Sequence, residues 1–207
     1  MEKFEVHRGV AAPLMRANID TDAIIPSREM KRVSKSGLAD GLFAGWRYLN
    51  EGERVPDPAF ALNQPAYAGA SILLAGPNFG CGSSREHAVW ALREFGIRAV
   101  IAPSFGAIFQ NNCIRNGLLP VELGEDALQE LARHTLHGPL TVDLVRCVVR
   151  AANGARYDFR IGDLPRQMLL EGLDPVALTL RLGDSIRAFQ ARDRNERPWI
   201  YLQPRAA

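Results

Sequence analysis

The chain contains 207 residues, of which 47% are hydrophobic and 23% are charged, a composition typical of a globular protein and not of a disordered one. Its 25 lysine and arginine residues almost balance its 23 aspartate and glutamate residues, and the net charge of +2 argues against a nucleic-acid-binding protein, which needs a basic face. The length suits one domain that spans residues 1–207.

The first third of the chain predicts two strands separated by loops. Residues 4–14 alternate loosely between apolar and polar side chains and predict a first strand that ends at Pro13. A polar turn follows at residues 18–22. Residues 31–45 are rich in lysine, serine, glycine and aspartate, so we expect a long mobile loop there whose composition cannot make a core. Proline residues then precede a buried strand over residues 71–75.

The middle third predicts a regular order of strands and helices. After the strand at 71–75, apolar spacing predicts helices over 84–95 and 104–116, and short apolar runs predict strands over 98–102 and 118–122. Strands that alternate with helices are typical of a parallel sheet. We therefore expect an α/β core.

The last third predicts a helix, a hairpin and a helical end. The helix is expected over 125–136, and the hairpin has predicted arms at 140–149 and 155–161 around an Asn-Gly turn. Apolar spacing then predicts a C-terminal helical segment over about 163–195.

The cysteine residues and the apolar stretches limit the classes of protein that fit. Cys81, Cys113 and Cys147 are far apart and form no Cys-x-x-Cys pair, so we expect neither a disulfide scaffold nor a metal or iron–sulfur site on this chain. The N-terminus lacks the pattern of a secretory signal, and the longest apolar stretch, residues 66–77, is too short to span a bilayer. We therefore expect a cytoplasmic protein that does not bind membranes.

The segment with the most chemical information is Phe-Gly-Cys-Gly-Ser-Ser-Arg-Glu-His at residues 79–87. A glycine-rich loop between a strand and a helix directs backbone N–H groups and the positive end of the helix toward a ligand, so it favours an anion site. No lysine follows the last glycine, as a P-loop requires, and the third glycine of a dinucleotide-binding loop is missing.

The same residues also have a purely structural interpretation. Ser83 and Glu86 have the spacing of a capping box, in which the two side chains satisfy backbone N–H groups at a helix start. In that interpretation Arg85 is only a surface residue. A cation in the first turn of a helix opposes the helix dipole, however, and this favours a fixed role for Arg85. The spacing alone leaves both interpretations open.

Several motifs narrow the choice because they occur together and in order. They are Gly-Ser-Ser-Arg-Glu-His at 82–87, Ala-Pro-Ser-Phe at 102–105, Asn-Asn-Cys-x-x-Asn-Gly-Leu-Leu-Pro at 111–120, Asn-Ile-Asp-Thr-Asp-x-Ile-Ile-Pro at 18–26, Trp-Arg-Tyr at 46–48, Gly-Leu-Asp at 172–174, Leu-Thr-Leu at 178–180 and Pro-Trp at 198–199. This set resembles the swivel domain of aconitase-type hydro-lyases, and more narrowly the bacterial small subunits of 3-isopropylmalate dehydratase. The resemblance implies an α/β fold, a swivelling β/β/α domain of the aconitase/isopropylmalate dehydratase small-subunit type.

The resemblance also implies a partner and a reaction. In that family a large subunit holds a 4Fe-4S cluster, whose open iron acts as a Lewis acid, so this chain itself is expected to bind no cluster and no metal. The expected assembly is a heterodimer or heterotetramer. Its substrate is a small dicarboxylate, and the reaction removes and re-adds water to convert 2-isopropylmalate to the 3-isomer in leucine biosynthesis.

Three residues receive direct roles from the resemblance. Ser83 matches the base that removes the proton next to a substrate carboxylate. Ser84 matches the neighbouring serine, which forms a hydrogen bond with the substrate or the loop. Arg85 matches the arginine that binds a substrate carboxylate, which a planar guanidinium does through two parallel N–H bonds.

Four further residues receive supporting roles. Gly80 and Gly82 supply the backbone of the glycine loop, and His87 is expected to hold that loop as a structural residue. Asp22 lies in the turn that matches the region beside the serine loop. It is either an orienting residue or a plain turn aspartate.

The sequence departs from the usual family pattern at two places. The loop reads Gly-Leu-Ala-Asp-Gly-Leu-Phe at 37–43, and Ala-Val-Trp stands at 88–90 where Ala-Pro-Trp is frequent. In related enzymes this loop determines which substituent the substrate carries. The sequence therefore leaves citraconate, dimethylmalate and homoaconitate open as substrates. Two alternatives of other classes are a non-catalytic module that binds an anion or RNA, and a structural or regulatory subunit.

Overall fold

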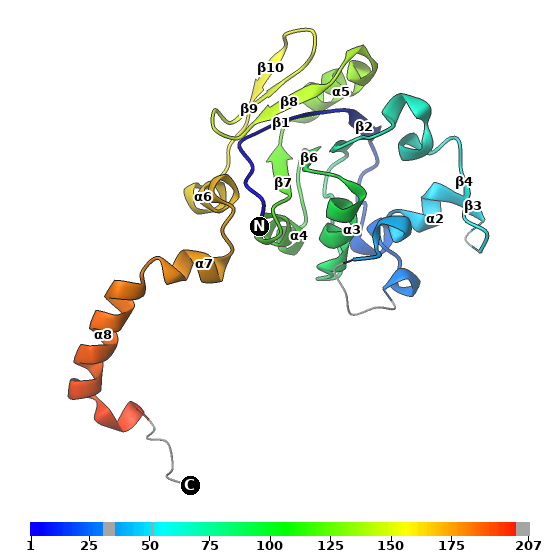
Figure 1. Ribbon diagram of the computed structural model, residues 1–207. Coiled ribbons are helices and arrows are strands. Elements are labelled where there is room, and N and C mark those ends of the chain that lie inside the picture. Colours follow the sequence, from blue (N-terminus) through cyan, green and yellow to red (C-terminus); the bar gives the residue numbers. More distant parts are fainter. Residues whose placement is uncertain (31–35, 51, 202–207) are drawn as a thin grey trace.

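The computed structural model describes residues 1–30, 36–50 and 52–201. Its centre is a parallel sheet (Figure 1) with the order β2 (Ala11–Leu14), β5 (Ile72–Ala75), β6 (Ala99–Ala102) and β7 (Leu119–Glu122). Every residue of β5 and β6 is buried, because both faces of a parallel sheet are covered. The predicted α/β core is confirmed.

Side chains of the central strands alternate between the two faces of the sheet. In β5, Leu73 and Ala75 join one hydrophobic cluster, whereas Ile72 and Leu74 join the other. The helices α1 (Thr21–Ile24), α2 (Ala44–Arg47), α3 (His87–Phe95) and α4 (Ala107–Arg115) contribute side chains to the first cluster. The helix α5 (Glu125–Arg133), the helix α6 (Asp163–Glu171) and a second sheet contribute to the other cluster.

The second sheet is antiparallel and pairs the N-terminal strand with three later strands. Its order is β1 (Val6–Gly9), β8 (Leu140–Asp143), β9 (Val148–Arg150) and β10 (Arg156–Asp158). The layers are therefore antiparallel sheet, parallel sheet and helices, which is the β/β/α order that the resemblance implies. A separate small hairpin joins β3 (Tyr48–Asn50) and β4 (Val55–Pro56).

The single strand predicted over residues 4–14 is wrong. The chain leaves the antiparallel sheet after Gly9 and enters the parallel sheet at Ala11. A Cβ atom at residue 9 would overlap the hydroxyl of Ser71, so the change of sheet takes place where a glycine allows two segments to approach closely. The Val10 carbonyl then accepts the backbone N–H of Ser71 and of Ile72.

The predicted hairpin is confirmed at its Asn-Gly turn, but its first arm is wrong. β9 and β10 pair around the Asn-Gly turn, but residues 140–149 are two strands, β8 and β9, and not one. The Asp143 carboxylate accepts the backbone N–H of Arg146 at 2.8 Å, and Cys147 adopts a left-handed conformation with φ of 52°. A tight turn therefore divides the arm.

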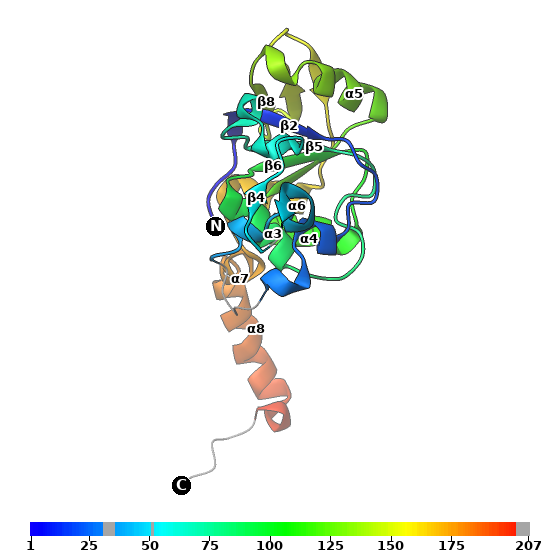
Figure 2. The same cartoon turned by 90° about the vertical axis from the view of Figure 1, so that its right-hand side faces the viewer.

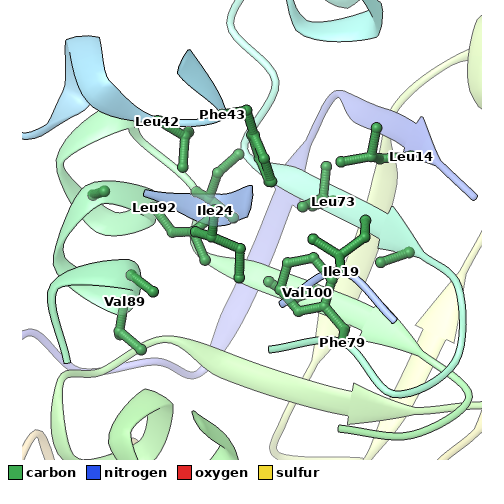
Figure 3. Close-up of a cluster of buried hydrophobic side chains, with 14 of the residues drawn as sticks. Leu14, Ile19, Ile24, Leu42, Phe43, Leu73, Phe79, Val89, Leu92 and Val100 are labelled. Carbon is green, nitrogen blue, oxygen red and sulfur yellow. The ribbon is translucent and has the colours of Figure 1, made fainter. Parts of the chain in front are cut away.

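The predicted loop over residues 31–45 is partly wrong. Residues 31–35 lie outside the described residues. The remainder contains a short 3-10 helix and the start of α2, and Leu38, Leu42, Phe43 and Ala44 are buried. Figure 3 shows Leu42 and Phe43 in the cluster with Ile24 and Leu73. The inference that the composition cannot make a core fails for this half, because most of its few apolar residues are buried.

The C-terminal region is helical, as predicted. After α6 come α7 (Pro175–Leu180) and α8 (Gly183–Glu196), and Figures 1 and 2 both show α8 extending away from the two sheets. Large apolar side chains are exposed along this tail, among them Leu182, Phe189 and Trp199. Within residues 1–30, 36–50 and 52–201, none of the helices combines the length and the apolar character that crossing a membrane requires.

The burial of residues 38–44 leads to a stability prediction. Leu42→Ala should lower the free energy of unfolding by about 2–5 kcal/mol, because it removes a fully buried side chain and leaves a cavity. Leu49→Ala is the matched control, since Leu49 is 67% exposed and its change should stay within about 0.5 kcal/mol. Chemical denaturation of both variants measures the difference. Equal, small effects would mean that the segment is not part of the core.

Candidate functional site

Two segments predicted to form the site lie side by side beyond the ends of β2 and β5. The Asn18 N–H donates to the Pro77 carbonyl at 2.9 Å, the Gly80 N–H to the Ile19 carbonyl at 2.7 Å, and the Thr21 N–H to the Cys81 carbonyl at 3.0 Å. The parallel pairing of the two strands therefore continues into the loops. It brings the polar turn at 18–22 against the glycine loop.

The glycines of this loop are required by its backbone and by its neighbours. Gly80 and Gly82 have φ values of 72° and 90°, which favour glycine. A Cβ atom at Gly80 would also overlap the ring of Phe109. The Phe79 side chain is fully buried (Figure 3). Its ring lies 5.3 Å from the Phe109 ring, centroid to centroid, and anchors the base of the loop.

Thr21 holds the segment that contains Ser83. Its hydroxyl donates to the Ser83 carbonyl oxygen at 3.0 Å, and its side chain is almost completely buried, with 2% exposure. Sequence reasoning selected the neighbouring Asp22 and missed Thr21. The only signal was the position of Thr21 within the Asp-Thr-Asp turn, where a buried threonine needs a hydrogen-bond partner.

Asp22 and Arg85 are brought together although they are far apart in the sequence. The Arg85 Nη1 donates to the Asp22 Oδ1 in an ion pair, with 26% of the arginine and 54% of the aspartate side chain exposed. The pair lies at the surface, so it contributes little to stability. It does restrict the direction of the guanidinium, which favours an orienting role for Asp22 over a plain turn residue.

The capping box, the purely structural interpretation of Ser83 and Glu86, does not form. The helix α3 begins at His87 and not at Ser84, and its N-cap residue Glu86 makes no side-chain capping bond. The Arg85 N–H instead donates to the Ser83 carbonyl at 2.8 Å and closes a turn before the helix. In the part of the chain that the structure describes, no hydrogen bond engages the Ser83 hydroxyl.

The helix-dipole argument for Arg85 is also wrong. Arg85 precedes the helix, so it does not occupy the first turn. We call residues 82–86 the serine–arginine loop. Ser83 and Ser84 are exposed on it, whereas Arg85 and Glu86 are partly buried. His87 follows as the first helical residue, and its ring lies 4.7 Å from the Trp90 ring, centroid to centroid.

The cysteines and other potential metal ligands are dispersed. Cys113 lies in the helix-side cluster and Cys147 packs against the other cluster, while Cys81 lies in the glycine loop. Burial raises the pKa of the Cys113 thiol well above its usual range. Over the described ranges, no three histidine, cysteine, aspartate or glutamate side chains gather in a group able to hold a metal ion.

Glu94, in the last turn of α3, binds the start of the 3-10 helix Ala39–Gly41. Its carboxylate accepts the backbone N–H of Gly37 at 2.6 Å and of Ala39 at 3.0 Å, and also that of Leu38. Desolvation acts to raise the pKa of Glu94, but the three backbone donors outweigh it, and the pKa lies below the usual value. The carboxylate therefore ties residues 37–39 to α3.

Comparisons with known proteins cover nearly the whole chain. The family model "Aconitase C-terminal domain" matches residues 1–126, and the model for the C-terminal domain of the 3-isopropylmalate dehydratase small subunit matches residues 176–201. A Cupriavidus necator protein, described as 3-isopropylmalate dehydratase small subunit, is 68% identical over 206 residues, which are 98% of this chain and 99% of that protein.

A solved structure is similar as well. The crystal structure of a 3-isopropylmalate dehydratase from Methanocaldococcus jannaschii is 30% identical to this chain, with a TM-score of 0.65. The alignment covers 89% of this chain and 99% of that one. The fold expected from the sequence motifs, a β/β/α domain of the aconitase type, is confirmed.

The geometry of Glu94 leads to a pH prediction. Because the folded-state pKa of Glu94 lies below its unfolded value, its contribution to stability is present above the unfolded pKa and is lost as pH falls through the folded pKa. Glu94→Gln should lower the free energy of unfolding at pH 7 by about 1 kcal/mol, a modest loss because the group is exposed. The difference from the parent chain should shrink in acid.

Thermal midpoints measured from neutral pH into acid give the test. Glu53→Gln, an exposed residue outside this contact, is the control and should leave the profile unchanged. A difference between Glu94→Gln and the parent chain that grows as pH falls would contradict the anchoring role.

Proposed function

The chain belongs to the family of 3-isopropylmalate dehydratase small subunits, and from this premise we propose that its serine–arginine loop forms part of the active site of that hydro-lyase. The reaction interconverts 2-isopropylmalate and 3-isopropylmalate by removal and re-addition of water, a step of leucine biosynthesis. The identity of 68% over nearly the full length favours this substrate over citraconate, dimethylmalate or homoaconitate. It also favours an enzyme subunit over an RNA-binding or purely structural module.

The observation that carries the proposal is the arrangement around Ser83. Its hydroxyl has no hydrogen-bond partner among the described residues, while its carbonyl is held by the buried Thr21. Two residues further on, Arg85 is oriented by Asp22. A free hydroxyl on a fixed backbone, close in sequence to an oriented cation, suits a group that acts on an anionic substrate.

Ser83 is proposed as the base that takes the proton from the carbon next to a substrate carboxylate. A serine alkoxide is strongly disfavoured in water, so the role requires a site from which water is excluded. Ser83 is exposed in this chain alone. A partner that covers the loop would remove that water and would leave the positive charge of Arg85 to favour the alkoxide. Ser84, exposed beside it, is proposed to form a hydrogen bond with the substrate or the loop.

Arg85 is proposed to bind a carboxylate of the substrate. Asp22 engages only Nη1 of the guanidinium, and the remaining N–H donors of the planar group suit the two oxygens of a carboxylate. Asp22 thereby acts as an orienting residue. Gly80 and Gly82 support the loop through backbone conformations that other residues rarely adopt, and His87 is proposed as a structural residue at the helix start.

The partner is proposed to be a large subunit with a 4Fe-4S cluster, in a heterodimer or heterotetramer. When bound, the cluster supplies a Lewis acid for the substrate hydroxyl. The dispersed cysteines of this chain support a cluster held by the partner. Cys113 and Cys147 lie in different hydrophobic clusters and cannot share one metal group. The exposed apolar residues of the tail support a protein partner. A cytoplasmic location stays a prediction.

Ser83→Ala tests the proposed base. In the complex with the large subunit, kcat should fall by roughly two to four orders of magnitude. The thermal midpoint should hardly change, because the hydroxyl makes no hydrogen bond in the part of the chain that is described. Ser185→Ala, on the exposed face of α8, is the control and should leave both quantities unchanged. Turnover of Ser83→Ala within a few fold of the parent would rule out the base.

Arg85→Lys tests the proposed carboxylate contact. Lysine keeps the charge but loses the planar pair of donors, so kcat/KM should fall by an amount equivalent to about 1.5–3 kcal/mol, and Arg85→Ala should do worse. Arg156→Lys is the matched control, since Arg156 forms an ion pair with Asp158 in the antiparallel sheet. Steady-state kinetics with excess large subunit give the comparison, and a parent-like kcat/KM in Arg85→Lys would contradict the contact.

A further inference from the structure

We propose that Asn116, at the end of α4, is a positioning residue for the serine–arginine loop, because its side chain holds Glu86, the residue at which that loop ends and α3 begins. This inference rests on the proposed function of the loop. Asn116 itself touches neither Ser83 nor Arg85 through any hydrogen bond of the described residues. It acts through Glu86.

The side-chain amide of Asn116 is fixed in one orientation by three partners. Its Nδ2 donates to the Glu86 Oε1 at 2.6 Å and to the Asn112 carbonyl at 2.9 Å. Its Oδ1 accepts the indole N–H of Trp90 at 3.0 Å. A carboxylate and a carbonyl only accept, and an indole N–H only donates, so the reversed amide would lose all three bonds. Only an amide satisfies this set.

The backbone of Asn116 is equally constrained. Asn116 is the C-cap residue of α4, and its N–H bonds to the carbonyls of Asn112 and Cys113, both at 3.1 Å. Gly117 follows with φ of 72°, and its carbonyl accepts the Arg93 Nη1 at 2.6 Å. The end of α4 is therefore bonded to α3 through both Asn116 and Gly117. The backbone that carries the Asn116 amide is held in place.

The serine–arginine loop consequently has two anchors of different origin. On the side of α1, Thr21 holds the Ser83 carbonyl and Asp22 pairs with Arg85. On the side of α4, Asn116 holds Glu86. The helix α3 has no side-chain cap, and the Glu86 carboxylate bonds to the Asn116 amide instead of to a backbone N–H of the helix start. Loss of one anchor should shift the loop without unfolding it.

Asn116→Asp gives the sharpest test, because it replaces the amide donor with a carboxylate of the same shape. The variant keeps an acceptor for Trp90 but places a negative charge against Glu86. In the complex with the large subunit we expect kcat to fall by roughly 10- to 100-fold, the scale of a displacement of about 1 Å of a catalytic group.

The double variant Glu86→Gln/Asn116→Asp reverses the donor and the acceptor of the same contact. The glutamine amide then donates to the aspartate, so part of the lost kcat should return, although the bond to the Asn112 carbonyl stays lost. Gln110→Glu is the matched control on the same helix: Gln110 Nε2 donates to the Glu122 Oε1 at 2.9 Å, and the change creates a similar pair of carboxylates away from the loop. Its kcat should equal that of the parent complex.

Two measurements separate positioning from general stability. Thermal midpoints report stability, and hydrogen exchange of the amides of residues 82–87 reports the loop. The proposal expects faster exchange in Asn116→Asp and recovery in the double variant. A parent-like kcat in Asn116→Asp, or a double variant that recovers the thermal midpoint but not kcat, would overturn it. If Asn116→Asp does not fold, Asn116→Ala, which adds no charge, must show the same loss of kcat.

Ser83→Ala distinguishes failure of this inference from failure of the proposed function. If Ser83→Ala retains turnover, the proposed role of the loop is wrong. If Ser83→Ala abolishes turnover while Asn116→Asp retains it, the loop is catalytic and only the role of Asn116 is wrong.

Discussion

The site depends on backbone pairing that continues past the ends of β2 and β5. Beyond the strand ends, the N–H groups of Asn18 and Thr21 keep the two segments in register through bonds to the carbonyls of Pro77 and Cys81. Parallel pairing fixes the relative position of two segments residue by residue. Asp22 and Arg85 therefore meet although 63 positions separate them, and the Thr21 hydroxyl reaches the carbonyl of Ser83.

Close approach from a third segment completes the position of the loop. Gly106 precedes α4, and a Cβ atom there would lie 2.6 Å from the Gly80 carbonyl oxygen. The Phe79 N–H donates to the Ser104 carbonyl, and the Gly106 N–H donates to the Phe79 carbonyl. The loop base is thus held between the turn before α1 and the start of α4. Its apex is exposed, yet its direction is determined by buried contacts, as pre-organised sites require.

The sequence was sufficient for the alternation of strands and helices from β5 to β7 and for the family, because apolar runs such as β5 and β6 and the ordered motifs are local signals. It was not sufficient where the contacts or the burial of a side chain depend on a residue far away in the sequence. The Ser-x-x-Glu spacing predicts a capping box, but Asn116, 30 positions away, satisfies Glu86 instead. The averaged composition of 31–45 conceals Leu42 and Phe43, whose burial depends on packing against Ile24.

The helix α3 connects the serine–arginine loop, at its start, to residues 37–39, at its last turn. Glu86 at its start bonds to Asn116, and Glu94 in its last turn binds the backbone of residues 37–39. The helix itself is immobilised by fully buried side chains such as Val89 and Leu92. Both loops are therefore held relative to each other before any partner binds. Association with a large subunit then orders few new groups, which reduces the entropy lost on binding. In the proposed function the large subunit adds the exclusion of water from Ser83 to the Lewis acid that its cluster would supply.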